Sequence, residues 1–91
     1  MIAICLALID DEDDRHVFER LYRKLNKTVY FTALRITDTK EDAEDAAQNV
    51  WLYTAKNLGR IQKLQEHELD PYFITMSKHA AFNVLKKYKI K

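Results

Sequence analysis

The sequence contains one glycine, one proline and one cysteine among 91 residues. So little glycine and proline excludes a turn-rich all-β fold and argues against long disordered segments. The single Cys5 cannot form an internal disulfide, which fits a reducing cytoplasm, and it has no metal-site spacing with the three scattered histidines. A chain of this length forms one small domain at most. We therefore expect a single all-α domain over residues 1–91, with no metal and no cofactor.

Long apolar runs are also missing. Residues 1–9 are apolar, but a membrane helix needs about 20 such residues, and a signal peptide needs a basic flank and a cleavage site. We interpret this segment as a short helix that packs on the domain. The alternative is that these residues form an exposed apolar surface that a missing partner would cover.

The formal net charge of +1 conceals a strong polarity along the chain. Residues 10–14 are five consecutive acids, whereas residues 71–91 contain five lysines and no acid. These lysines are Lys78, Lys86, Lys87, Lys89 and Lys91. A basic element with aromatics is typical of a nucleic-acid surface, although lysines more often simply solvate a helix.

Apolar spacing predicts three main helices. The first starts near Asp11 and keeps helical spacing from Phe18 to Ile36. The second starts at Asp38 or Thr39, either of which can cap it, and Gly59 in a left-handed conformation would end it. The third starts with Asp70 as cap and Pro71 at its first position. Residues 60–70 form either an ordinary linker or a binding loop.

The central helix has an apolar stripe on one side and a polar arc on the other. The expected buried residues are Ala43, Ala46, Ala47, Val50, Trp51, Tyr53, Thr54 and Leu58. Leu52 falls in the middle of the polar arc. It is either an ordinary exposed leucine or the apolar centre of a docking face with a charged rim.

The last helix has the same two-sided pattern. The expected buried side contains Phe73, Met76, Ser77, Ala81, Val84 and Tyr88, and the opposite basic arc includes Lys89. Phe82 lies near the middle of that arc, where a ring among lysines suits single-stranded nucleic acid. The alternative is that Phe82 packs against residues 1–9 or the first helix.

Two stretches also resemble a known family. Residues 42–52, Asp-Ala-Glu-Asp-Ala-Ala-Gln-Asn-Val-Trp-Leu, resemble region 2.2 of bacterial RNA polymerase sigma factors, especially the small extracytoplasmic-function (ECF) group. Residues 72–87 are similar to regions 2.3 and 2.4. Tyr72, His79 and Asn83 depart there from the usual Trp, Asn and Asp. The resemblance extends from about Phe18 to Lys87.

The resemblance implies a fold, two partners and two sets of site residues. The fold would be a sigma region 2-like bundle of three main helices plus a short N-terminal helix, without the region 4 that reads the minus-thirty-five element. Core RNA polymerase would bind the central helix through its largest-subunit clamp coiled coil, at Asp42, Asp45, Gln48, Asn49 and Leu52. The non-template strand of the promoter minus-ten element would bind the last helix, at Tyr72, Lys78, His79, Phe82, Asn83, Lys86 and Lys87. An anti-sigma factor is a further candidate partner.

The sequence therefore predicts a non-enzymatic transcription initiation domain in the cytoplasm. An alternative is a protein-interaction module of the same fold that holds polymerase or an antagonist without opening DNA. An enzyme is disfavoured because the carboxylates lie on a helix face, with no paired nucleophile and no glycine-rich loop.

Overall fold

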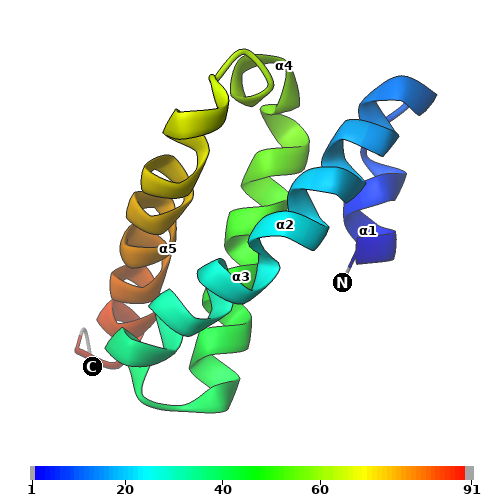
Figure 1. Ribbon diagram of the computed structural model, residues 1–91. Coiled ribbons are helices and arrows are strands. Elements are labelled where there is room, and N and C mark those ends of the chain that lie inside the picture. Colours follow the sequence, from blue (N-terminus) through cyan, green and yellow to red (C-terminus); the bar gives the residue numbers. More distant parts are fainter. Residues whose placement is uncertain (1, 90–91) are drawn as a thin grey trace.

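A computed structural model describes residues 2–89 of the chain, with side chains as far as Lys87. All regular structure in that part is helical, in the order α1 (Ile2–Ala7), α2 (Glu12–Thr37), α3 (Lys40–Lys56), α4 (Leu58–Ile61) and α5 (Glu66–Lys89) (Figure 1). The expected all-α bundle with a short N-terminal helix is confirmed, and α4 adds one turn. The expectations for the side chains of Tyr88, Lys89 and Lys91 lie outside the described residues.

Helix α2 begins and ends where local chemistry favours it. The side chain of Asp11 accepts a hydrogen bond of 3.1 Å from the backbone N–H of Asp14, and three acids occupy the first turn, where the helix dipole favours negative charge. At the other end, Asp38 adopts a left-handed conformation with φ of 65°. Its backbone N–H bonds the carbonyl of Leu34, which closes the helix and turns the chain towards α3.

Helix α3 is capped by Thr39, whose hydroxyl accepts from the backbone N–H of Asp42 at 3.3 Å. The expectation that Gly59 ends this helix is wrong. The helix ends at Lys56, and Asn57 satisfies the last turn by donating from its side chain to the carbonyl of Tyr53 at 2.9 Å. Gly59 lies inside α4, and it has no left-handed conformation.

The predicted start of the last helix is also wrong. Helix α5 begins at Glu66, so Pro71 lies inside it rather than at its first position. The carboxylate of Glu68 accepts the backbone N–H of Gln65 at 2.8 Å, which is one half of a capping box. This cap stabilises a helical turn before Pro71. Proline has no backbone N–H to pair with the carbonyl of His67, four residues earlier, and His67 is exposed.

Trp51 lies at the centre of the main core. Its indole packs edge-on against Phe18 from α2 and stacks on Phe73 from α5, with ring centroids 5.8 and 5.4 Å apart respectively. A second cluster at the other end of the bundle consists of small residues, which are Ala33, Ala43, Ala46, Ala81 and Val84. Small side chains allow α2, α3 and α5 to approach closely at that end.

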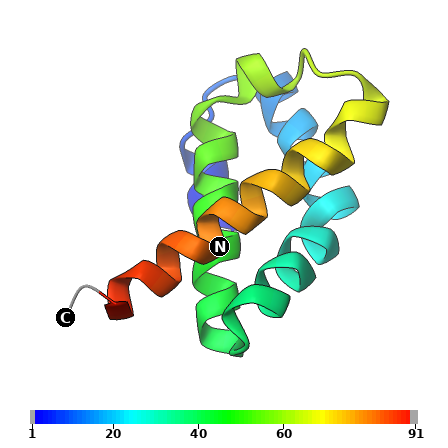
Figure 2. The same cartoon turned by 90° about the vertical axis from the view of Figure 1, so that its left-hand side faces the viewer.

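Helix α1 packs beside the second half of α3 (Figures 1 and 2). Its buried residue Cys5 belongs to the main core, as does Ile9 just after it. The structural interpretation of the N-terminal segment is therefore confirmed for the described residues. Ile4 and Leu8 on the other side of the segment are exposed.

Candidate functional site

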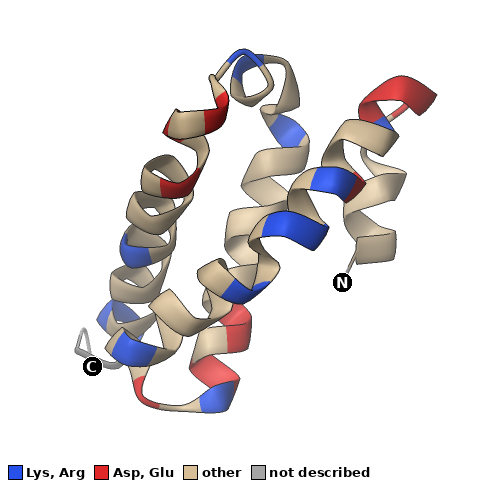
Figure 3. Ribbon diagram, in the orientation of Figure 1, with Lys and Arg blue, Asp and Glu red and all other residues tan. Residues whose placement is uncertain are grey.

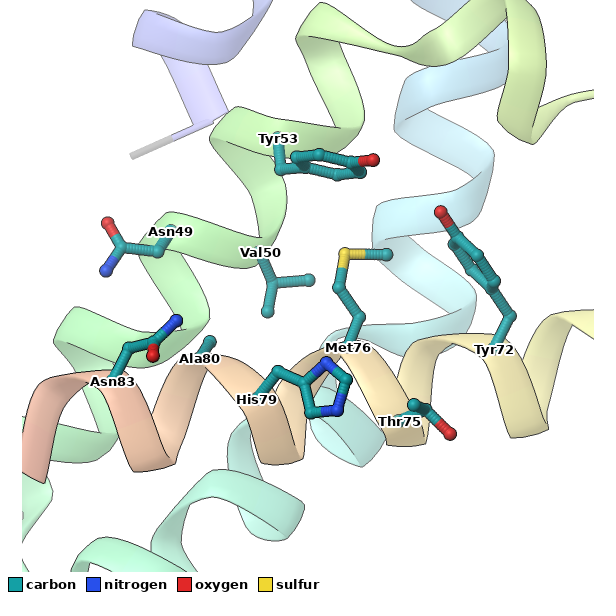
Figure 4. Close-up of a pocket in the computed structure, with 9 residues that line it drawn as sticks. All are labelled: Asn49, Val50, Tyr53, Tyr72, Thr75, Met76, His79, Ala80 and Asn83. Atoms are coloured by element: carbon teal, nitrogen blue, oxygen red, sulfur yellow. The ribbon is translucent and has the colours of Figure 1, made fainter.

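A cavity of about 500 Å³ opens between α3 and α5 (Figure 4). Figure 4 shows the rings of Tyr53 and Tyr72 at one end of this cavity and the amides of Asn49 and Asn83 at the other. The full lining is Asn49, Val50, Tyr53, Tyr72, Thr75, Met76, His79, Ala80 and Asn83. An apolar floor with rings and amides at its edges suits a planar group that carries hydrogen-bonding atoms.

Arg60 lies beside the tyrosine end of this cavity. Its guanidinium donates to the hydroxyl of Tyr53 and lies 5.8 Å from the centre of that ring. Burial raises the pKa of the Tyr72 hydroxyl above its ordinary value of 10.0; neighbouring Tyr53 acts in the same direction, and Arg60 acts against it. The Tyr72 hydroxyl is therefore protonated at neutral pH and can donate a hydrogen bond.

The outer side of α5 is exposed and basic. Phe82 is 52% exposed, which agrees with its predicted place on the basic arc and not with the alternative that it packs against residues 1–9 or the first helix. The other exposed residues predicted for this face are Lys78, His79, Asn83, Lys86 and Lys87. Tyr72 is half-buried and lies edge-on to Phe73, with ring centroids 5.7 Å apart. The α5 face, defined as these seven residues, combines cations with an exposed ring.

The five residues predicted on α3 do not form one free face. Asp45 and Asn49 are exposed, whereas Asp42 is half-buried. Gln48 lines a second cavity of about 330 Å³ between α2 and α3, and Asn49 lines the cavity beside α5. Figure 3 shows acids over the first half of α3 and lysines towards the end of α5 (Figure 3).

Leu52 and Tyr53 lie differently from their expected positions. Leu52 is half-buried and packs against the main core, so it is not a fully solvent-facing leucine. Tyr53, expected on the buried stripe, is 40% exposed. Helix α1 also packs on α3, and Leu52 packs against the same core as Cys5 of α1. The other seven residues of the predicted stripe are buried.

Among the residues at or beside the cavity, the sequence interpretation assigned no functional role to Tyr53, Met76 and Arg60. Tyr53 and Met76 have apolar spacing in their own helices, and that spacing could not distinguish core from cavity wall. Tyr53 lies at the edge of the α3 stripe, and a polar hydroxyl at that edge is the one signal that favours a partly exposed position.

The described residues contain no group of three or more histidines, cysteines or acids placed to hold a metal ion. Within the same range, no helix is long and apolar enough to cross a membrane.

These features define a class of helical binding domain, in which acids on α3 and a basic, aromatic face on α5 are held by one core. The family model of Sigma-70 region 2 matches residues 21–89, which is most of the chain. The chain therefore belongs to the sigma-70 region 2 family, a family of transcription initiation domains that bind core RNA polymerase and recognise the promoter minus-ten element. No curated protein and no solved structure matches the chain.

Proposed function

We propose that this chain is the region 2 domain of an ECF-type sigma factor acting in the cytoplasm. In this proposal α3 binds the clamp coiled coil of core polymerase and the α5 face binds the non-template strand of the minus-ten element. The main support is the exposure of Phe82 between exposed Lys78 and Lys86 on α5. Lysines can follow phosphates while a ring stacks on a base, and a single strand uses both contacts.

On α3, the exposed residues carry the polymerase proposal. Asp45 and Asn49 are accessible, and Asp42 and Gln48 are accessible in part. Half-buried Leu52 would contribute the apolar part of the contact. A small apolar area with a polar rim is common in protein interfaces. The family resemblance extends the partners to an anti-sigma factor, which would compete for these surfaces.

The test measures the affinity of the 91-residue chain for core polymerase by biolayer interferometry. Asp45→Lys should weaken binding about tenfold or more and leave the thermal melt unchanged, because Asp45 is exposed. Asp10→Lys, the same change at an exposed position outside α3, is the matched control and should bind like wild type. An Asp45→Lys variant that binds as tightly as wild type would remove α3 from the polymerase interface.

A second measurement separates the two functions by adding labelled single-stranded minus-ten DNA to the complex. Binding of the strand supports the initiation domain. A complex that forms with polymerase and fails to bind the strand would identify an interaction module instead.

A further inference from the structure

The outer side of α2 carries cations that the described bundle leaves uncovered. Residues 20–37 contain five basic residues and no acid. The five are Arg20, Arg23, Lys24, Lys27 and Arg35, and all are exposed. Figure 3 shows basic segments spaced along α2, after the acidic turn that starts it. We refer to these five residues and Phe31 as the α2 stripe.

The stripe occupies one side of the helix. Stepping about 100° per residue from buried Val29, the five cations fall about 120–240° away, opposite the core. Phe31 falls about 200° away, within the same arc. Positions 20 to 35 span roughly 22 Å along the axis, which is enough to follow several nucleotides. The stripe is therefore continuous and faces solvent.

Ion pairs within the bundle neutralise little of this charge. Arg23 lies 3.9 Å from Glu19, and Lys24 pairs with Glu66 of α5. Both pairs are on the surface, where such pairs contribute little. Arg20, Lys27 and Arg35 have no ion-pair partner in the described part of the chain. The stripe consequently presents a net positive field that attracts a polyanion.

Exposed Phe31 indicates which kind of polyanion binds the α2 stripe. It is 51% exposed, and its described ring contact is an edge-on one with Tyr30 at 5.3 Å. An acidic protein segment would pair with the cations and would not require the ring of Phe31. Duplex DNA hides the faces of its bases inside the stack. A single strand offers both phosphates for the cations and a base face for the ring.

We propose that the α2 stripe binds single-stranded nucleic acid, as a second surface separate from the α5 face. Arg20, Lys27 and Arg35 contact phosphates, and Phe31 stacks on one base. The evidence for this surface comes from α2 alone. The proposal rests on the proposed function only for the identity of the strand. That strand would be promoter DNA that extends beyond the part bound by α5.

The experiment measures fluorescence anisotropy of a labelled thymidine oligonucleotide of about 20 nucleotides, across a salt series. Phe31→Ala should weaken binding at least about fivefold, and Phe31→Tyr should restore it, because both rings stack. Lys27→Gln with Arg35→Gln should reduce the slope of log affinity against log salt by about 1.4, since each phosphate contact on a single strand contributes about 0.7. Lys40→Gln with Lys56→Gln removes the same charge from exposed positions of α3 and should leave the slope unchanged.

Three results would overturn the proposal. The first is an unchanged affinity in both α2 variants. The second is an equal loss of slope in the Lys40 and Lys56 control, which would mean a nonspecific charge effect. The third is displacement of the oligonucleotide by polyglutamate at equal charge with no effect of Phe31→Ala, which would indicate an acidic protein partner.

Failure of the α5 proposal would be distinguishable in the same assay. Phe82→Ala with Lys86→Ala would then bind like wild type while the α2 variants weaken binding. The reverse pattern would exclude the α2 stripe and leave the α5 face as the binding surface.

Discussion

The indole of Trp51 on α3 stacks on the ring of Phe73 on α5, with centroids 5.4 Å apart and planes 30° apart. Both side chains are almost completely buried. This contact joins α3, which carries the proposed polymerase-binding residues, to α5, which carries the proposed DNA-binding residues. The two proposed surfaces therefore keep a fixed separation as long as this pair is intact.

Trp51 should tolerate phenylalanine far better than alanine. Its indole Nε1 is buried with no hydrogen-bond partner in the described part of the chain, and such a donor costs about 1–3 kcal/mol. Trp51→Phe removes that cost, so we expect a loss of unfolding free energy below about 2 kcal/mol, against about 3–5 for Trp51→Ala. Urea unfolding checks both values. A Trp51→Phe loss as large as that of Trp51→Ala would contradict the expectation that removing the indole N–H is favourable.

Leu52→Asp should reduce stability as well as polymerase binding. Leu52 packs against the main core, so a carboxylate there loses hydration without a partner. We expect a loss of about 1–3 kcal/mol in urea unfolding. Asn49→Asp, which adds the same charge at an exposed position in the middle of the same helix, is the control and should alter stability little. A wild-type melt for Leu52→Asp would place Leu52 fully in solvent, as the helical wheel predicts.

Phe82→Ala and Lys86→Ala should weaken single-stranded minus-ten DNA binding through separable contributions. The lysine contribution should fade with salt, at a slope of roughly 0.7 per phosphate. The phenylalanine contribution, about 1–3 kcal/mol of stacking, should persist. Affinities of wild type and both single variants across a salt series test this. Identical slopes for wild type and Lys86→Ala would show that Lys86 contacts no phosphate.

Gly59 and Asp38 should respond oppositely to larger side chains. A Cβ at Gly59 would meet no atom within 4 Å, so Gly59→Ala should stabilise the domain by about 0.4–1 kcal/mol. Asp38 has a left-handed φ of 65°, so Asp38→Val should destabilise the domain by about 1–2 kcal/mol. Thermal melts measure both. A destabilised Gly59→Ala variant would contradict the helical conformation of α4.

Sequence periodicity predicted the three long helices and most of their buried sides because core contacts repeat with the helical period. The ends of the helices were harder to predict. Pro71 is a conspicuous signal for a helix start, but the capping contact of Glu68 sets the start of α5 earlier. Gly59 is a conspicuous signal for a helix end, but α3 ends before Asn57. The cavity between α3 and α5 was not predictable. Its walls come from two helices, and the spacing within one helix says nothing about its angle to another.

The buried thiol of Cys5 can report local unfolding of α1. Burial raises the pKa of its thiol, and the side chain has no solvent exposure, so an alkylating reagent can reach it only when α1 lifts away from α3. Because the sequence has no other cysteine, every modified molecule records one such opening. The alkylation rate thus counts local unfolding events at the edge of the α3 surface, and a partner that clamps α1 in place would slow it.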